Sequence, residues 1–431
     1  MRWTKSLALT AALLLAAPAF SADKPDIGLP TVKPEKMGFS SERLKALDTA
    51  MDALVDKGRL PGILTIVARH GKVVAVNVYG AKDTEAKAPL TADTIFRMYS
   101  QTKPVTAVAM TILFEEGKWK LDDPVTKFVP EFKNLKVFKG LDDKGQPILE
   151  PVSRSATMRE LMTHTAGFAY GLVTDNPVDK AYFESGLLGS KNLDAMLGEA
   201  TTLPLANQPG ARWKYSIAVD IQGAIVERLS GQSLPDFMQS RIFGPLGMKD
   251  TGFYVPDDKK PRQAALYAVN PKSRAIVPAE GFMVLDVSKP PTMAMGGGGL
   301  VSTAHDYLRF AQMLANGGAL DGVRILSPAG VKMMESNHLS DAVMAQKPMG
   351  PGMGFGFDGS VVMDPAAAGT LAGKGTYSWG GAAGTWFWVD PENDVVFLGM
   401  IQVLGWYGMG DVNLEHLSQT LVYSALVDPK K

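Results

Sequence analysis

A serine and a lysine three residues apart are the first side chains in this sequence whose types and spacing could do chemistry. They begin and end the segment Ser100-Gln101-Thr102-Lys103, and Pro104 follows. This spacing places both side chains on one face if a helix begins here, and proline is typical of a first helical turn. A serine hydroxyl becomes a nucleophile when a base takes its proton, which a neutral lysine amine can do. Burial and the positive end of a helix dipole both favour that neutral form. The motif therefore predicts Ser100 as a nucleophile and Lys103 as its base.

The composition excludes several other chemistries. The chain has 431 residues and no cysteine, so thiolate metal sites, disulfides and a cysteine nucleophile are ruled out. Its five histidines never have the HExxH spacing, and no G-x-S-x-G elbow occurs, which disfavours a zinc hydrolase and an α/β-hydrolase. The 44 basic and 44 acidic residues balance, so nothing favours a nucleic-acid partner. We expect no metal and no cofactor.

The N-terminus has the pattern of a secretory signal. Arg2 and Lys5 precede an apolar stretch over residues 7–17, which is shorter than the ~20 residues of a membrane span. Small residues then precede Ala22, where we expect cleavage. The prediction is a signal peptide over residues 1–21, no membrane span after its removal, and a periplasmic or secreted protein. An uncleaved membrane anchor is the alternative.

Hydrophobic periodicity predicts the elements that must position the motif. A helix begins near Ser40, and two apolar runs over residues 63–68 and 73–79 indicate a hairpin. From Ser100 onward most periodic segments are helical, and Thr157 with Glu160 forms a capping box. Strands return near the C-terminus over residues 386–389 and 395–400, before a last helix over residues 414–426.

This order predicts an α+β fold: an antiparallel sheet flanked by helices and built from both termini, with an inserted, mainly helical domain. The expected sheet domain covers residues 22–98 plus 295–431, and the expected helical domain covers residues 99–294. The glycine run over residues 296–299 lacks the lysine of a phosphate-binding loop, so we interpret it as close packing at the domain junction.

Five segments in this order resemble the serine β-lactamase and penicillin-binding-protein superfamily, in particular class C β-lactamases and family VIII carboxylesterases. The resemblance covers nearly the whole chain after residue 21 and implies the β-lactamase/transpeptidase-like fold, with the active site between the two domains. The segments are Phe96-Arg97-Met98-Tyr99-Ser100-Gln101-Thr102-Lys103-Pro104, Leu161-Met162-Thr163-His164-Thr165-Ala166-Gly167, Tyr215-Ser216, Gly298-Gly299-Leu300-Val301-Ser302-Thr303 and Trp379-Gly380-Gly381.

The resemblance implies a role for Tyr215, which is otherwise more typical of a satisfied core tyrosine. Its phenol would relay a proton between Ser100, Lys103 and the leaving group, helped by a nearby cation. Asp220 would orient Lys103 or Tyr215, or it is a surface carboxylate. His164 is interpreted as structural.

The chain departs from the lactamase pattern at the strand beside the site. Trp379, Gly380 and Gly381 stand where lactamases have Lys-Thr-Gly, as they do in family VIII esterases, and we expect them to contact substrate. By resemblance, the amides of Ser100 and Ala382 would form the oxyanion hole.

A second departure follows the tyrosine. Ile217 stands where lactamases have an asparagine, so it would line the substrate site without an amide.

These features predict an esterase that cleaves small-molecule esters through a Ser100 acyl-enzyme. A β-lactamase or D-alanyl-D-alanine peptidase on the same scaffold is the first alternative. A non-catalytic binding protein with the same fold is the second. The sequence does not specify an oligomeric state.

Overall fold

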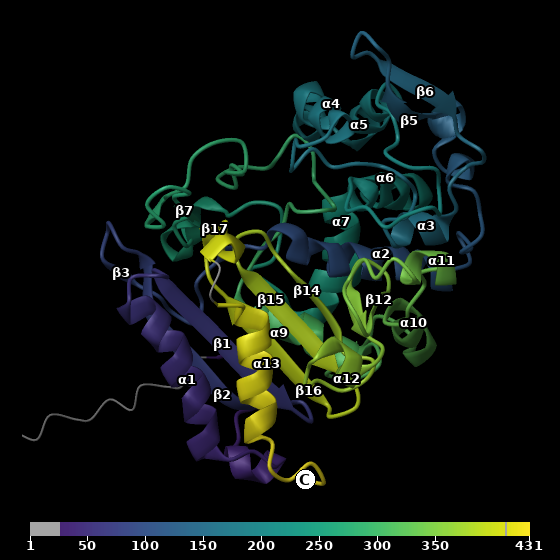
Figure 1. Ribbon diagram of the computed structural model, residues 1–431. Helices are drawn as coiled ribbons and strands as arrows, with labels where there is room; N and C mark the ends of the chain where they lie inside the picture. The colour runs from purple at the N-terminus through teal and green to yellow at the C-terminus, as the bar shows by residue number, and fades with distance from the viewer. Residues whose placement is uncertain (1–25, 410–411) are drawn as a thin grey trace, which may run out of the picture.

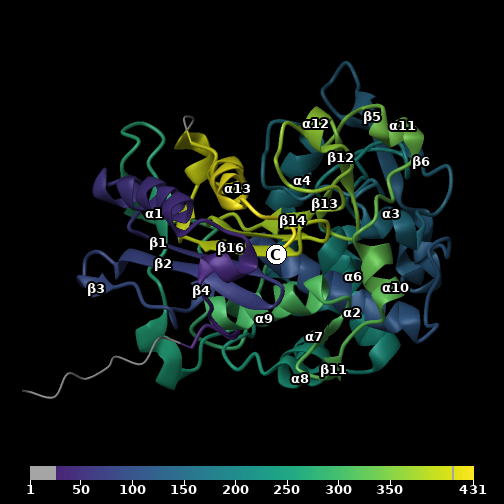
Figure 2. The ribbon, with the colours of Figure 1, turned by 90° about the horizontal axis from the view of Figure 1, so that it is seen from below.

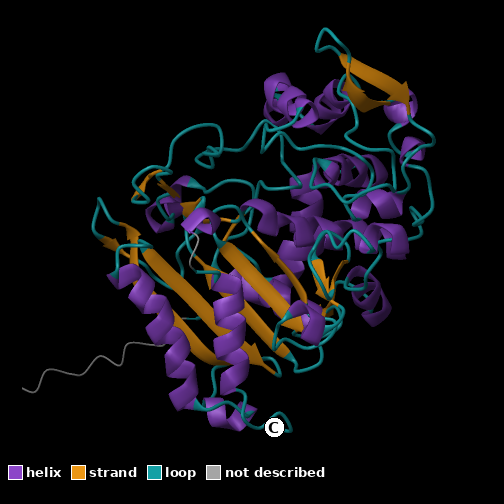
Figure 3. Cartoon of the chain, in the orientation of Figure 1, coloured by secondary structure: helices purple, strands orange, loops and turns teal. Residues whose placement is uncertain are grey.

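The computed structural model describes residues 26–409 and 412–431, so the predicted signal peptide lies outside the described residues. An eight-stranded antiparallel sheet dominates one half of the molecule, and helices dominate the other (Figures 1 and 3). Strands from both ends of the chain share this sheet, which confirms the predicted antiparallel sheet flanked by helices. In spatial order they are β12 (Met353–Phe355), β13 (Ser360–Val362), β14 (Tyr377–Gly380), β15 (Thr385–Asp390), β16 (Val395–Met400), β1 (Gly62–Arg69), β2 (Lys72–Asp83) and β3 (Ala88–Pro89).

Helices cover both faces of this sheet. Helices α1 (Ser41–Asp56) and α13 (Leu414–Ala425) lie on one face and α9 (Ala304–Ala315) lies on the other, as Figure 2 shows. Successive side chains of a strand point to opposite faces. Accordingly, Val395 and Phe397 of β16 pack in the cluster that includes α1 and α13, whereas Val396 and Leu398 join the larger core with α9. Both faces are buried, so β16 reads as a continuous apolar run.

The predicted helices and hairpins are present with small shifts at their ends. Ser40 caps α1, and the capping box of Thr157 and Glu160 begins the short helix α3 (Met158–Met162). A further hairpin, β5 (Lys136–Leu141) and β6 (Pro147–Pro151), lies in the helical half of the molecule. The remaining helices of this half are α2 (Lys103–Glu115), α4 (Pro177–Ser185), α5 (Leu193–Ala200), α6 (Ala218–Ser230), α7 (Leu234–Met238) and α8 (Gly244–Leu246).

The span predicted as mainly helical also carries strands that bind the sheet half. β7 (Tyr267–Val269) pairs with β8 (Ile276–Pro278) and with β17 (Val403–Leu404).

β4 (Phe96–Arg97), shortly before the serine motif, pairs with β9 (Val301–Ser302), shortly after the glycine run. These pairings hold the two motifs side by side. The smaller elements are β10 (Ala319–Leu320), β11 (Val323–Arg324), α10 (Pro328–Met334), α11 (Asp341–Met344) and α12 (Pro365–Ala368).

No helix within residues 26–409 and 412–431 is both long enough and apolar enough to span a membrane.

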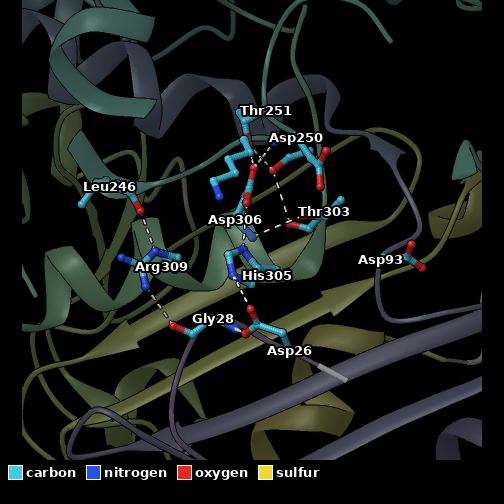
Figure 4. Close-up of polar contacts among 12 residues, drawn as sticks. Asp26, Gly28, Asp93, Leu246, Asp250, Thr251, Thr303, His305, Asp306 and Arg309 are labelled. Atoms are coloured by element: carbon cyan, nitrogen blue, oxygen red, sulfur yellow. Dashed lines mark hydrogen bonds and ion pairs between the residues drawn. The ribbon is translucent and has the colours of Figure 1, made fainter. Parts of the chain in front are cut away.

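A polar cluster ties the first described residues to α9 (Figure 4). The buried Asp306 carboxylate accepts hydrogen bonds from the Asp250 amide, at 2.7 Å, and from the Thr251 hydroxyl, at 2.9 Å. It also contacts Nδ1 of His305 at 2.8 Å, and Nε2 of His305 lies 3.6 Å from Asp26. His305 therefore links a buried carboxylate of α9 to the N-terminal segment.

His305→Gln should destabilise the fold more at acid pH than at alkaline pH. The hydrogen bond with Asp306 raises the pKa of His305, burial opposes this, and Asp26 supports it against the nearby cation of Arg309. A raised folded-state pKa means that the stabilisation is complete below the unfolded value of about 6.5 and is lost as pH rises through the folded value. Loss of the charge-assisted bond should cost about 1–2 kcal/mol of unfolding free energy at pH 5.5.

Urea unfolding at pH 5.5 and pH 9 checks this expectation. The exposed His416 gives a matched control, since only its backbone amide takes part in the cap of α13, and His416→Gln should behave alike at both values. An equal loss for His305→Gln at both pH values would contradict the assignment.

Candidate active site

Ser100 lies on a short 3₁₀ turn (Tyr99–Thr102) that leads directly into α2. Tyr99 has a positive φ of 46°, a left-handed conformation that is uncommon for a residue with a side chain. Its hydroxyl donates to the carbonyl of Met283 at 2.7 Å, which anchors the turn. Ser100 is consequently half-buried at the wall of a cavity, while Lys103, the first residue of α2, is fully buried.

Three acceptors surround the ammonium group of Lys103. Its Nζ donates to Oγ of Ser100 at 3.2 Å, to the carbonyl of Gly297 at 2.6 Å, and to the hydroxyl of Tyr170 at 3.4 Å. The predicted spacing therefore does bring Lys103 into contact with Ser100.

The pKa of Lys103 corrects one expectation from the sequence. Burial alone lowers it, but the phenols of Tyr170 and Tyr215 and the carboxyl of Asp220 more than offset this and raise it above its ordinary value. The lysine is therefore protonated at rest, and the expected lowered pKa is wrong. The helix start therefore lowers the pKa of Lys103 by less than the three polar groups around the amine raise it.

Tyr215 lies against this lysine within a cluster of aromatic rings. Nζ of Lys103 lies 4.5 Å from the centroid of the Tyr215 ring and 5.0 Å from that of Tyr170. The Tyr215 ring packs against His164 at 4.9 Å and Trp379 at 5.8 Å between centroids. The structure thus brings together the three residues predicted as catalytic.

His164 has the structural role expected from the sequence. It is buried, and Nδ1 lies 2.9 Å from the hydroxyl of Ser216, the neighbour of Tyr215. Burial, with a smaller effect of the Lys103 charge, lowers its pKa well below the ordinary value, so the ring is neutral. It packs beside Tyr215 and holds the backbone next to it.

Asp220 and the glycine run complete the surroundings of the lysine. Asp220, in the first turn of α6, is 1% exposed, so the surface alternative is excluded. Its Oδ1 accepts from the amide of Gly297 at 3.0 Å, while Oδ2 has no hydrogen-bond partner among the described residues. Burial raises its pKa and the charge of Lys103 opposes this rise. Asp220 thus supports Lys103 both through its charge and through Gly297.

The end of β14 lies on the other side of Ser100. A side chain at Gly381 would place its Cβ 2.2 Å from the carbonyl of Met98, so only glycine fits there. The next residue, Ala382, lines the same cavity as Ser100. Its amide makes no hydrogen bond within the described part of the chain, and it is therefore available to a substrate oxygen.

Two hollows meet at this group of residues. A chamber of about 420 Å³ is lined by Ser100 and Ala382, and an open cleft of about 770 Å³ is lined by Tyr215. Tyr170 and Leu172 line both, so the two hollows adjoin at these residues.

The Beta-lactamase family model matches residues 47–420 of this chain. The chain belongs to the Beta-lactamase family. Within the family it is 41% identical to "Protein Rv1367c" of Mycobacterium tuberculosis over 356 residues, which cover 80% of this chain and 87% of that protein. It is 34% identical to "Esterase EstB" of Burkholderia gladioli over 361 residues, or 80% of this chain and 86% of the relative.

Solved structures give the same fold. The solved structure of EstCE1, described as a hydrolase with promiscuous acyltransferase activity, superposes with a TM-score of 0.74 at 28% identity. The match covers 89% of this chain and 99% of the EstCE1 chain. These matches confirm the β-lactamase/transpeptidase-like fold, and together with the esterase-named relative they show that the chain is a serine hydrolase of this family.

For two residues of this Beta-lactamase family member, the position in the structure differs from what the sequence indicated. Ile217 is fully buried in the main core and lines neither hollow, so its predicted contact with substrate is not supported. Tyr170, by contrast, was not identified as a site residue. The one signal that could have pointed to it is its position three residues after the matched segment that ends at Gly167.

The glycine run also does more than was inferred. Its packing role is real, since a Cβ at Gly296 would lie 2.6 Å from the carbonyl of Val219. In addition, Gly297 accepts from Lys103 and donates to Asp220. The Trp379 ring lies tilted against the ring of Tyr215 and edge to face with that of Phe355. It lines neither hollow, and its contact with substrate remains a prediction.

Proposed function

We propose that this serine hydrolase is a carboxylesterase that cleaves small esters through an acyl-enzyme on Ser100. The observation that carries the proposal is the 3.2 Å contact between Nζ of Lys103 and Oγ of Ser100 at the wall of a largely apolar chamber. The relative named Esterase EstB, which is 34% identical, supports the same assignment.

The proposed reaction has two halves. Oγ of Ser100 attacks the ester carbonyl carbon while its proton passes to the Lys103 amine, and the amides of Ser100 and Ala382 stabilise the resulting oxyanion. The bond to the alcohol oxygen then breaks, and Tyr215 donates the proton that this oxygen needs. The Lys103 ammonium passes the serine proton on to Tyr215, so both groups are reset for the second half. A water molecule next attacks the acyl-enzyme by the same route and releases the acid and Ser100.

The raised pKa of Lys103 determines how this base works. Only the neutral amine can accept the serine proton, and its fraction at neutral pH is small. Proton transfer to the amine becomes more favourable as its basicity rises, which offsets part of the loss that comes from the small neutral fraction. Since the neutral fraction increases about tenfold per pH unit below the pKa, activity should rise into the alkaline range.

Esters should be better substrates than β-lactams by roughly one to two powers of ten in kcat/KM. A β-lactam carries a carboxylate that lactamases bind with the lysine and threonine of their edge strand. Trp379 and Gly380 occupy those positions here and offer no cation. Loss of a charge-assisted hydrogen bond costs about 1.5–3 kcal/mol, whereas an apolar ester loses nothing.

A comparison of p-nitrophenyl butyrate with a chromogenic cephalosporin tests the proposal and its main alternative together. Slow hydrolysis of the cephalosporin is compatible with an esterase, because the lactam ring is intrinsically reactive. If the cephalosporin is an equal or better substrate, the lactamase alternative replaces the esterase. If a fluorophosphonate probe fails to label the protein and neither substrate is turned over, the binding-protein alternative replaces both.

A further inference from the structure

Three apolar side chains form a partition between the chamber beside Ser100 and a second hollow. Leu188, Leu285 and Met295 line both the chamber and a neighbouring hollow of about 240 Å³. All three side chains are half-buried. We propose that this partition, and Leu188 in particular, sets the length of the acyl chain that the enzyme accepts. The inference rests on the proposed esterase function and adds the substrate class: esters of medium-length, uncharged acyl groups.

The position of the proton donor decides which half of the ester enters the chamber. Tyr215 lines the open cleft and not the chamber. The leaving alcohol must lie where Tyr215 can protonate its oxygen, so it points to the cleft. The acyl group stays bonded to Ser100 and, with its carbonyl oxygen near the amide of Ala382, extends into the chamber that both residues line.

The chemistry of the chamber fits an uncharged acyl group. None of the described residues that line it is Asp, Glu, Lys, Arg or His. Its walls include the aliphatic Leu172 and Leu187 and the aromatic Tyr182. A volume of about 420 Å³ lies in the lower part of the range of 300–1,000 Å³ that is usual for small-molecule sites. A carboxylate or ammonium in this space would lose hydration without gaining an opposite charge.

Two aromatic side chains limit the chamber on its outer side. Phe183 of α4 and Phe282 of the segment before Met283 meet edge to face, with ring centroids 5.1 Å apart at 79°. Both line the chamber, although they are 46% and 60% exposed. Their contact joins the two sides of the mouth. A longer acyl chain is therefore expected to meet the partition rather than open solvent.

The second hollow provides the space that the partition withholds. Besides the shared residues it is lined by Phe253, Val287 and Met293, with Asp286 and Lys289 also among its lining residues. Truncation of Leu188 at Cβ removes the atoms that separate the two spaces at that point. A longer chain could then continue past Leu285 and Met295 and bury further methylene groups.

The test is the chain-length profile of Leu188→Ala on p-nitrophenyl esters from acetyl to dodecanoyl. Each extra buried methylene should improve kcat/KM about fourfold while there is room. The ratio of kcat/KM for the decanoyl ester to that for the butyryl ester should therefore rise at least tenfold over wild type. Leu188→Phe, which thickens the partition, should shift the optimum to shorter chains and lower the octanoyl-to-acetyl ratio at least tenfold.

Matched controls separate this inference from the proposed function. Leu371→Ala removes a leucine that is 58% exposed and lines neither the chamber nor the second hollow, and it should leave the profile unchanged. The acetyl ester reports the chemistry in every variant. Variants that hydrolyse the acetyl ester but keep the wild-type ratios would overturn the inference and leave the esterase intact. A wild-type enzyme that hydrolyses none of the esters would overturn both. If Leu188→Ala does not fold, the outcome for Leu188→Phe decides.

Discussion

Ser100→Ala is expected to reduce ester turnover at least about a thousandfold, as loss of the nucleophile does in other serine hydrolases. The fold should survive, because Ser100 is only half-buried and its hydroxyl has a single hydrogen bond among the described residues, with Nζ of Lys103. The lysine keeps its bonds to Gly297 and Tyr170 in the variant. Purified wild-type and variant proteins should therefore unfold at similar temperatures while kcat for p-nitrophenyl butyrate differs by three powers of ten.

A matched control and a chemical probe sharpen this test. Ser240→Ala removes an exposed serine hydroxyl of the helical half that bonds only locally, and it should keep full activity. A fluorophosphonate should add one label to wild type and to Ser240→Ala, and none to Ser100→Ala. If Ser100→Ala retained more than about a tenth of wild-type turnover, another residue would have to be the nucleophile.

Local signals in the sequence predicted the elements of the fold with good accuracy. The helix cap at Ser40 and the capping box at Thr157 depend on neighbours within three residues, so their outcome is visible in the sequence. The runs that became β1 and β16 are equally local, since burial on both faces requires apolar residues throughout. The strand order of the sheet, by contrast, joins segments more than 300 residues apart and came from the order of the elements and the resemblance.

The active site shows the same division. Ser100 and Lys103 are three residues apart, and their contact follows from a helix start. Tyr215 and Ala382 could be named only through the resemblance. Gly297 contributes a carbonyl oxygen, which every residue has, so no side-chain pattern could indicate it.

Two properties depend on packing that the sequence does not display. The pKa of Lys103 is raised by three groups from other parts of the chain, Tyr170, Tyr215 and Asp220, and this direction is opposite to the one that a helix start and burial predict. Ile217 follows Tyr215 at the spacing of the lactamase amide. It stands at the N-cap position of α6, however, and its side chain is buried in the core. The same position in a motif can thus point into the site or away from it.

Lys103→Arg is expected to be nearly as damaging as Lys103→Ala, with losses of about a thousandfold in kcat/KM. An arginine keeps the positive charge beside Tyr215 and Asp220, but a guanidinium does not give up its proton near neutral pH. The dependence of wild-type activity on pH should likewise follow the neutral form of Lys103. Because the pKa of Lys103 is raised, the neutral amine is scarce at pH 7, and log kcat/KM should rise by about one per pH unit up to the limit set by the stability of the protein.

Rescue by added amines distinguishes loss of a base from disturbed packing, since Lys103 is fully buried and a guanidinium is larger than an ammonium. Lys103→Ala leaves a space next to Ser100 into which methylamine can diffuse. Methylamine should restore part of the activity, in proportion to its neutral form and therefore increasingly with pH, whereas guanidinium chloride at equal concentration should not. Ser100→Ala serves as the control, because no amine can rescue an enzyme without its nucleophile. An active Lys103→Arg enzyme, or rescue of Lys103→Ala by guanidinium as well as by methylamine, would show that the lysine supplies only charge and that another group takes the serine proton.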